Sequence, residues 1–548
     1  MASIPEILSA RLEALTGTDP ELRPATKPQF GHYQCNVALR LAADQGRKPR
    51  EIAQEIVDKL AVDDLCEPLE IAGPGFINIR IRTSVLAEAV TQQLADPHAG
   101  IVQTATPGTV VVDYSAPNVA KPMHVGNLRS TIIGDCLVRV LRATGNTVIP
   151  QNHIGDWGTQ FGMLVEQILV EGIDADTLSL DTSVELYKRA QAHFRSDPDF
   201  AEAARLRVVA LQSGDEPTRA IWRSLINVSK AGFNRAYARL GVLLTDADLA
   251  GESIYNSMLD AVATDLSTAG IATLDQGALC VFLPGDDAPL IVRKSDGGYG
   301  YAATDLAAVR YRVTSLHANR MIYVVGSPQA HHFAQVFATA RLAGWLPESV
   351  TTEHVGFGSV LGPDGKMFKT REGKAVTLDT LLDAAEEVAQ PEVAMAAVKY
   401  ADLSNALHKD YVFDVQRMTA TTGDTGPYLQ YAHARVSQIL RRADADPELT
   451  GDRSDRLSAL DEPAEQSLAL TLTKFASVVD DVAANLQPHK LCGYLFELAT
   501  QFSSFYELCP VLASAGETRR SRLVLCRATQ QVLASGLDLL GIHAPESM

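Results

Sequence analysis

One stretch, residues 110–150, constrains the fold more than any other part of the 548-residue chain. Its first residues, 110–112, form a β-branched run that is typical of a strand buried on both faces. A polar loop follows over residues 113–121. Apolar residues then recur at the spacing of a helix with one buried face: Leu128, Ile132, Ile133, Leu137, Val138 and Leu141. A second strand-like run covers residues 147–149. The stretch therefore predicts a βαβ unit whose polar loop lies at the carboxyl end of the first strand.

The polar loop and the residues after it have the features of a nucleotide site. Gly126 allows a ligand to approach the backbone closely, and the helix start presents free N–H groups to phosphate. His124 and Lys121 add hydrogen-bond donors that can stabilise the negative charge that develops on a leaving phosphate. The sequence contains neither GxxxxGK[ST] nor GxGxxG after a strand, which excludes the common phosphate-binding loops.

Residues 115–127, SAPNVAKPMHVGN, resemble the first signature of class I aminoacyl-tRNA synthetases, H-x-G-H, in the form of the arginyl-tRNA synthetase family. The chain departs from the motif at Asn127, which replaces the second histidine and can donate a hydrogen bond but carries no charge. The string HIGD at residues 153–156 looks like the same motif but follows a strand instead of opening the long helix. We therefore place the signature at His124.

The resemblance covers nearly the whole chain and implies a multidomain α/β fold. FGHYQCNVA and IAGPGFINIRI are similar to the N-terminal domain of the family, which contacts the outer corner of tRNA; for Phe30, Tyr33 and Gln34 the alternative is local packing. We expect a small N-terminal α/β domain, a linker, a Rossmann-like parallel-sheet catalytic domain with a helical insertion, and an all-α anticodon-binding bundle. The expected boundaries are 1–82, 83–108, 109–391 with the insertion at about 164–275, and 392–548.

A carboxylate and a phenol share one face of a second predicted helix. Tyr301 and Asp305 are four residues apart, and together they suit a guanidinium group, since the carboxylate accepts paired N–H bonds and the ring lies against the cation. The alternative is a helix-dipole acid beside a core tyrosine. The resemblance implies that both hold the arginine side chain. It further implies contacts with arginine from Gln329, Asp113 and Asn118.

A glycine-rich basic loop covers residues 362–373, after the predicted last strand of the sheet at 354–361. The pattern alone is typical of a solvated hairpin tip. Its position corresponds to the second class I signature, K-M-S-K-S, which Lys366 and Lys369 match in degenerate form; a one-residue shift, FKTREG, fits the following residues better. The resemblance implies that Lys121 compensates. We expect the catalytic groups to be His124, Asn127, Lys121, Lys366 and Lys369.

His331 and His332 could suggest a metal site, but adjacent side chains point apart and no third ligand lies nearby in the sequence. By resemblance, His332 lies near ATP. We expect the ATP-binding residues to be Gly126, His124, Asn127, His332 and Lys369. The expected cofactor is ATP with Mg²⁺ that travels with the nucleotide, and no structural metal is expected, since the seven cysteines are scattered without a CxxC pair.

Composition sets the remaining expectations. The sequence has no long apolar run and no signal-like start, so we expect a cytoplasmic protein without a membrane partner. The net charge of −18 argues against a non-specific nucleic-acid binder but allows a local basic patch. Candidate residues for such a patch on the C-terminal bundle are Arg435, Arg441, Arg442, Arg519, Arg520 and Arg522.

The resemblance implies a monomeric enzyme with three substrates: L-arginine, ATP and tRNA(Arg). It would activate arginine as the adenylate and transfer it to the 3′-terminal adenosine, with activation that requires bound tRNA. Two alternatives stay open. One is a small-molecule nucleotidylyltransferase, in which the terminal domains would have no substrate. The other is an inactive RNA-binding paralogue, against which the retained His124, Lys121, Tyr301 and Asp305 argue.

Overall fold

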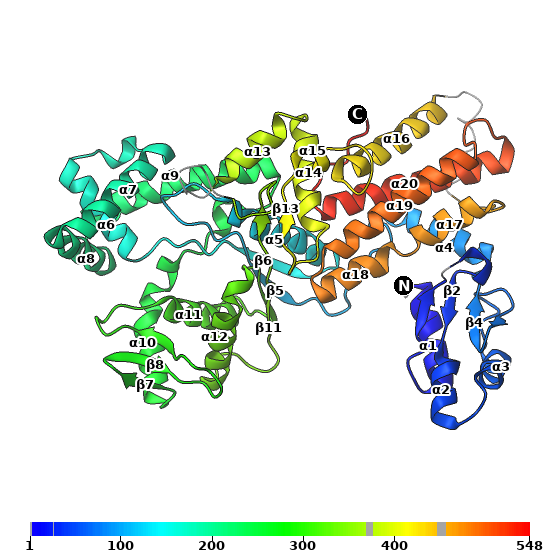
Figure 1. The fold of residues 1–548 in the computed structure, drawn as a ribbon, viewed down its shortest axis with the longest axis horizontal. Helices are drawn as coiled ribbons and strands as arrows, with labels where there is room; N and C mark the ends of the chain where they lie inside the picture. Colours follow the sequence, from blue (N-terminus) through cyan, green and yellow to red (C-terminus); the bar gives the residue numbers. More distant parts are fainter. Residues whose placement is uncertain (1–2, 26, 369–375, 446–455) are drawn as a thin grey trace.

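The computed structural model describes residues 3–25, 27–368, 376–445 and 456–548. Figure 1 shows an elongated molecule, with the helices of residues 159–240 at one end of the long axis and residues 4–79 at the other. A parallel sheet lies between them, and the C-terminal helices cover one side of it. Among the described residues, no helix is long and apolar enough to cross a membrane.

The N-terminal domain is a four-stranded antiparallel sheet with helices, as predicted. The strand order is β1 (Leu22–Pro24), β2 (Tyr33–Cys35), β4 (Phe76–Ile79) and β3 (Glu70–Ala72). The helical elements are α1 (Ile4–Thr16), η1 (Pro28–Phe30), α2 (Val37–Gln45) and α3 (Pro49–Lys59). Ser3 and Glu6 form a capping box at the start of α1. Tyr33 is buried, and the Gln34 amide donates to Asn78 at 2.8 Å, which supports local packing for these two residues.

The predicted βαβ unit is confirmed at the centre of the molecule. The parallel sheet has the order β11 (Thr351–His354), β10 (Arg320–Tyr323), β5 (Thr109–Asp113) and β6 (Thr147–Gln151). Helix α5 (Val125–Ala143) connects β5 to β6, and η5 (Ser327–Gln329) with α12 (Ala330–Leu342) connects β10 to β11. The 110–112 run is buried, as expected for a central parallel strand.

A helical insertion separates the two halves of the sheet. It contains α6 (Thr159–Glu171), η2 (Ala175–Thr177), α7 (Leu180–Ser196), α8 (Pro198–Ser213), α9 (Glu216–Leu240) and η3 (Asp246–Asp248). The chain then forms η4 (Glu252–Tyr255), α10 (Asn256–Thr268), the antiparallel sheet β7 (Ala272–Asp275), β8 (Ala278–Val281) and β9 (Leu290–Arg293), and α11 (Tyr301–Thr314). The predicted helix that carries Tyr301 and Asp305 is confirmed.

The predicted last strand at 354–361 is wrong in its bounds. The sheet strand β11 ends at His354, and β12 (Val360–Leu361) pairs instead with β13 (Tyr411–Val412). Two glycines interrupt the run. A Cβ on Gly358 would lie 2.6 Å from the Asp410 carboxylate, so the backbone turns away there to pack closely against the C-terminal segment.

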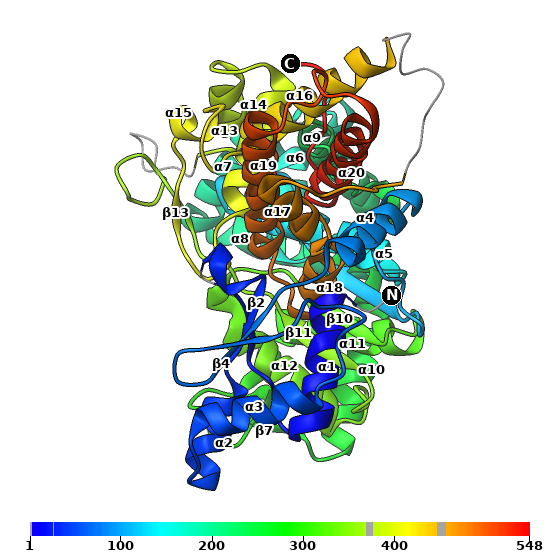
Figure 2. The ribbon, with the colours of Figure 1, turned by 90° about the vertical axis from the view of Figure 1, so that its right-hand side faces the viewer.

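The C-terminal part is helical, as predicted. Its helices are α13 (Leu378–Glu386), α14 (Pro391–Leu403), α15 (Val415–Met418), α16 (Gly426–Asp444), α17 (Pro463–Leu472), α18 (Phe475–Asn485), α19 (His489–Leu508) and α20 (Gly516–Leu539). Helix α5 packs against α14, α18 and α20, while the linker helix α4 (Thr83–Ala95) packs against α17 and α20 (Figure 2).

One residue of the expected basic patch lies elsewhere. The Arg522 side chain is buried, and its Nε donates to Glu465 at 2.7 Å, so it stabilises the bundle instead of facing solvent. The sequence could not reveal this, because the buried acid that pairs with Arg522 lies 57 residues away in the chain.

Candidate active site

The candidate site lies where the strand order of the parallel sheet reverses. Strands β5 and β10 are neighbours, yet the connection after β5 leads to one side of the sheet and the connection after β10 to the other. The loops at their carboxyl ends therefore separate and leave a crevice, which is where open α/β sheets bind ligands. The predicted residues Asp113, His124 and Gln329 lie on these two connections.

The loop after β5 is held in an unfavourable backbone conformation. Ser115, Ala116 and Ala120 have φ angles of 72°, 45° and 58°, in the left-handed region that L residues rarely adopt. The Ala116 N–H donates to Asn152 at 3.1 Å, and the Ala120 N–H donates to the Ser229 hydroxyl of α9 at 2.8 Å. Partners from β6 and the insertion thus fix the loop before any ligand binds.

His124 caps helix α5 and presents a donor outward. Its Nδ1 accepts the Gly126 N–H at 2.9 Å, so the neutral ring carries its proton on Nε2. Desolvation by the surrounding loop, and then the charge of Lys121, lowers the pKa of His124, which favours the neutral form. A Cβ on Gly126 would lie 2.6 Å from the His124 ring, so the glycine makes room for the imidazole itself.

Asn127, which replaces the second histidine of the motif, is buried and engaged. Its Oδ1 accepts the His124 N–H at 3.1 Å, which completes a capping box, and its Nδ2 donates to the Ser115 carbonyl at 3.4 Å. The side chain therefore joins the loop to the helix start. An uncharged amide suits this position because it donates and accepts at once.

The segment that begins at Val376, after the glycine-rich basic loop, lies beside the first signature. The Val125 N–H donates to Val376 O at 3.1 Å, and the Leu378 N–H donates to Met123 O at 2.8 Å. The start of the loop is a tight hairpin in which Gly362 N–H donates to the carbonyl of the exposed Lys366. Lys369 lies outside the described residues. The described part thus consists of a hairpin at 362–366 and a segment from Val376 that contacts the signature loop.

Lys121 points toward the insertion. Its Nζ lies 4.1 Å from the ring centroid of Tyr187, on α7. This cation–π contact holds the ammonium near the signature loop without neutralising its charge.

Two acids and a phenol form the other end of the site. Tyr301 is 76% exposed at the start of α11, which overturns the alternative of a core tyrosine. Asp305, one turn further, lies 2.6 Å from the ring of His332, through its Oδ2 and the ring Nε2. Burial, followed by the charges of Asp156 and Asp305, raises the pKa of Glu252 to about 8. Among the described residues no lysine or arginine pairs with Glu252 or Asp305, so this acidic cluster suits a positively charged ligand.

Glu252 was not among the residues predicted from the sequence. Asp156 explains its placement. This buried carboxylate accepts the Ser253 N–H at 2.9 Å and the Ser253 hydroxyl at 2.6 Å. A Cβ on Gly251 would lie 2.3 Å from Asp156, so only glycine fits there. The HIGD string thus anchors the segment that carries Glu252.

A buried arginine, also missed, lies beneath the cluster. Arg312 is completely buried; its Nη2 donates to Asp113 Oδ2 at 2.7 Å and its Nε to Gln151 Oε1 at 2.6 Å. The guanidinium lies 4.9 Å from the Tyr323 ring centroid. The sequence gives no local signal for it, because the same helix carries a second arginine, Arg310, and the acid partner of Arg312 lies 199 residues away. Asp113 is therefore held at the end of β5 with a fixed orientation.

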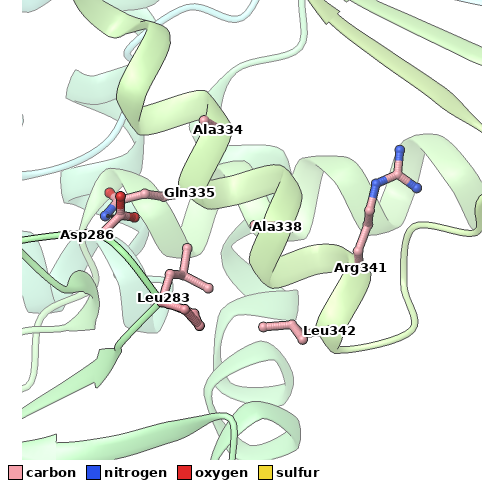
Figure 3. Close-up of a pocket in the computed structure, with 8 residues that line it drawn as sticks. Leu283, Asp286, Ala334, Gln335, Ala338, Arg341 and Leu342 are labelled. Atoms are coloured by element: carbon pink, nitrogen blue, oxygen red, sulfur yellow. Dashed lines mark hydrogen bonds between the residues drawn. The ribbon is translucent and has the colours of Figure 1, made fainter.

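The other two predicted arginine contacts are exposed at the crevice. Asn118 forms a parallel bridge with Gly155, and Gln329 ends η5 just before α12. A separate cavity of about 550 Å³ lies on the flank of α12, lined by Leu283, Pro284, Asp286, Ala334, Gln335, Ala338, Arg341 and Leu342 (Figure 3). None of the predicted site residues lines it.

No group of three histidines, cysteines or acids that could hold a metal ion occurs within the described ranges. The seven cysteines are buried and unpaired. The chemistry available at the crevice is therefore that of a positive helix start, a neutral histidine and an acidic cluster, all within one chain.

Three family models match the chain. Residues 2–81 match the arginyl tRNA synthetase N-terminal domain, residues 89–393 the catalytic domain of class I tRNA synthetases of the arginine type, and residues 429–548 the DALR anticodon-binding domain. Together these matches extend over most of the chain.

The chain is also similar to named proteins over its full length. It is 61% identical to an arginine–tRNA ligase of Cutibacterium acnes and 49% identical to one of Thermobifida fusca, with 100% of both chains covered in each case. Among solved structures, the arginyl-tRNA synthetase of Plasmodium falciparum superposes with a TM-score of 0.87 at 29% identity, again over 100% of both chains.

Proposed function

The chain belongs to the arginyl-tRNA synthetase family, and from that premise we infer that it is an arginine–tRNA ligase. It uses ATP to activate L-arginine and transfers the arginyl group to tRNA(Arg). The observation that carries this function is the acidic cluster of Glu252 and Asp305 beside Tyr301, on the same sheet edge as His124. An acidic cluster at an adenylate-forming crevice fits a cationic amino acid.

We propose that the cluster binds the arginine side chain. Asp305 and Glu252 accept the guanidinium N–H groups, and the exposed Tyr301 ring covers the planar cation. The contact with His332 orients Asp305, which gives this histidine a role on the arginine side in addition to the ATP contact expected of it. Gln329 supplies a further contact from the start of α12.

The main-chain groups of arginine belong at the end of β5. We propose that Asp113, oriented by Arg312, holds the amino group, and that Asn118 donates to the carboxylate. This arrangement directs a carboxylate oxygen toward the start of α5. Because arginine and ATP are held in one crevice, their relative positioning lowers much of the activation barrier for adenylate formation.

The nucleotide binds at the start of α5 in this proposal. Gly126 lets the phosphates approach the helix start, and Asn127 holds His124 in place. A carboxylate oxygen of arginine attacks the α-phosphorus, and the bond to the bridging oxygen breaks as pyrophosphate leaves. His124 Nε2–H, Lys121, Lys366 and Lys369 stabilise the charge that develops on the phosphate oxygens. Mg²⁺ enters with ATP as part of the substrate.

In the second step, a hydroxyl of the 3′-terminal adenosine of tRNA attacks the arginyl carbonyl carbon and AMP leaves. We propose that residues 1–82 and 392–548 hold the tRNA at its outer corner and anticodon, with 83–108 as a linker and 109–391 as the catalytic domain. The enzyme acts as a monomer in the cytoplasm. Site residues supplied by one chain support the first point, and the buried free cysteines suit a reducing compartment.

ATP–pyrophosphate exchange with each amino acid, with and without tRNA, tests the proposal. We expect exchange with arginine alone, appearing on addition of tRNA(Arg), and transfer of labelled arginine to the tRNA. Exchange without RNA would remove the tRNA requirement and keep the enzyme. Absence of arginine exchange in a chain that binds tRNA would support the inactive paralogue instead.

A further inference from the structure

A buried polar junction lies halfway along α5, far from the crevice. Asp135 of α5 and Lys399 of α14 are each 2% exposed. The Asp135 carboxylate accepts the Arg139 Nε at 2.8 Å and the Leu243 N–H at 2.7 Å. The Lys399 Nζ donates to Gly541 O at 2.5 Å, just beyond the end of α20. These residues do not belong to the binding site described above.

The junction joins four separate parts of the chain. Arg139 extends it on both sides, because its guanidinium donates to Gly241 O at the end of α9 at 2.9 Å and to Asp538 of α20 at 3.2 Å. Gly541 is packed closely against it: a Cβ there would lie 3.0 Å from Lys399 Nζ and 3.1 Å from Asp135 Oδ2. The signature helix, the insertion, α14 and the C-terminal turn therefore meet at one point.

Stability alone is a poor explanation for an ammonium at this position. Burial lowers the pKa of Lys399 to about 8, although Asp135 opposes this effect. Removing a charge from water costs free energy, and an apolar residue of similar volume often packs as well or better. The neighbours of Lys399 on its own helix, residues 394–398, are apolar and buried, so the lysine interrupts a hydrophobic face.

The C-terminal tail connects the junction to α16 of the anticodon-binding bundle. After Gly541 the chain runs along α16, which binds its carbonyl groups in three places. Gln430 donates to His543 O at 2.9 Å, the His433 ring nitrogen lies 2.8 Å from Pro545 O, and Arg441 donates to Glu546 O at 2.8 Å. Movement of α16 would therefore displace the tail and, with it, Gly541.

We propose that Lys399 is a positioning residue that, through Asp135 and Gly541, holds α5 in register with the C-terminal bundle and transmits tRNA docking to His124. The inference rests on the proposed function, which supplies the tRNA. From Asp135 to the capping residue His124, α5 continues without a break over about 16 Å. A small shift at the junction thus changes where the imidazole lies in the crevice.

Two variants of the full-length chain test the proposal from opposite sides. Lys399→Met removes the ammonium. Gly541→Ala adds a methyl group against it at a φ of +66°. Gly516→Ala is the matched control, since Gly516, the first residue of α20, has a φ of +58° but open space around its Cβ. Any excess effect of Gly541→Ala is then due to the junction and not to backbone strain.

The measurements are exchange kinetics at saturating tRNA(Arg), tRNA affinity and hydrogen exchange of the 124–130 amides. We expect both junction variants to lower kcat of arginine exchange about tenfold, within the usual range of coupling between sites. The KM for arginine and the tRNA affinity should stay within about twofold. Addition of tRNA should change the protection of 124–130 in the wild type but not in Lys399→Met. Gly516→Ala should match the wild type.

Wild-type kcat in both junction variants would overturn the proposal, as would a loss of tRNA affinity equal to the loss of kcat, which indicates a structural role. Failure of the proposed function looks different, since the wild-type chain itself would then show no arginine exchange. If Lys399→Met does not fold, Gly541→Ala against Gly516→Ala decides the question alone.

Discussion

The two ends of the crevice are built differently. At the arginine end, Asp113 and Asp305 have partners before the substrate arrives, in Arg312 and His332. At the nucleotide end, the donors face outward: His124 presents Nε2–H, and Lys366 stands exposed on a hairpin. In the proposed assignment, the first end binds the permanent charge of arginine through side chains that are already held in place, while the second end stabilises a charge that exists only during the reaction. Substitutions at the first should change arginine binding, and substitutions at the second should change the rate.

The largest effect is expected at the arginine end. Asp305→Asn removes the charge that meets the guanidinium but keeps the shape of the side chain. We expect kcat/KM for arginine to fall ~10³-fold, because an ion pair in a partly closed site loses one partner. The measurement is ATP–pyrophosphate exchange over a range of arginine concentrations, with the KM for ATP unchanged.

Asp265→Asn is the control for this variant. Asp265 lies on α10, pairs with Arg310 at 2.8 Å and has a half-exposed side chain. It should behave as the wild type. If Asp305→Asn keeps the wild-type affinity for arginine, the side-chain pocket has been assigned to the wrong residues and the contrast between the two ends fails.

The next effect is at the nucleotide end. His124→Ala removes the outward donor, and we expect kcat of adenylate formation to fall ~10²-fold with KM for arginine unchanged, as when one donor to a developing charge is lost. Single-turnover adenylate formation measures this. His331→Ala, an exposed histidine at the start of α12, should have no effect. A variant that instead loses tRNA affinity would show that His124 serves the RNA.

A smaller effect is expected in the pH dependence of arginine binding. Because burial raises the pKa of Glu252 to about 8, most of it is protonated at pH 7 in the free enzyme. Arginine favours the carboxylate, so binding should release a proton, and affinity should rise with pH up to about 8 and then level off. Titration calorimetry in two buffers of different ionisation enthalpy measures the release. Glu252→Gln should abolish it; equal heats in the wild type would contradict the assignment.

The smallest effect separates the lysines. Lys121→Met and Lys366→Met should each raise the KM for ATP about fivefold, since exposed ion pairs contribute little individually. Lys121→Met should also raise the pKa of His124, because the lysine charge lowers it. The pH profile of exchange then distinguishes the two variants. Lys188→Met, paired with Glu185 on α7, is the control. An unchanged KM for ATP in both variants would show that cationic side chains other than Lys121 and Lys366 contact the pyrophosphate.

The two ends of the crevice also differ in how well the sequence predicts their residues. His124, Gly126 and Asn127 are contiguous, so one string identified the nucleotide end and its helix. Tyr301 and Asp305 were predicted because they share one helical face and because the resemblance favoured a contact with arginine over the alternative. Glu252 was not, since its place beside Asp305 depends on Asp156, almost a hundred residues earlier in the chain. Local patterns capture groups on one element, while groups assembled from several elements need the fold.

Buried charges were the other group that the sequence could not place. Arg312 and Arg522 look like surface residues of helices, and only their acid partners in distant elements show that they are internal. The misplaced strand at 354–361 has a similar cause, because Gly358 packs against Asp410, which is remote in the sequence. Periodicity predicted the helix after the first signature correctly, since α5 depends on its own apolar face.

The loop that carries the first signature has a consequence for attempts to shorten the protein. Ser115, Ala116 and Ala120 adopt backbone conformations that cost about 1–3 kcal/mol each, and hydroxyls on α9 help to hold them. A shortened catalytic domain without α6–α9 would keep every residue of the signature motif. It would lose the hydrogen bonds that hold the signature loop in its conformation. The loop and α9 therefore depend on each other. Changes on the far side of the insertion should be tolerated, but loss of α9 should remove the loop conformation that the reaction needs.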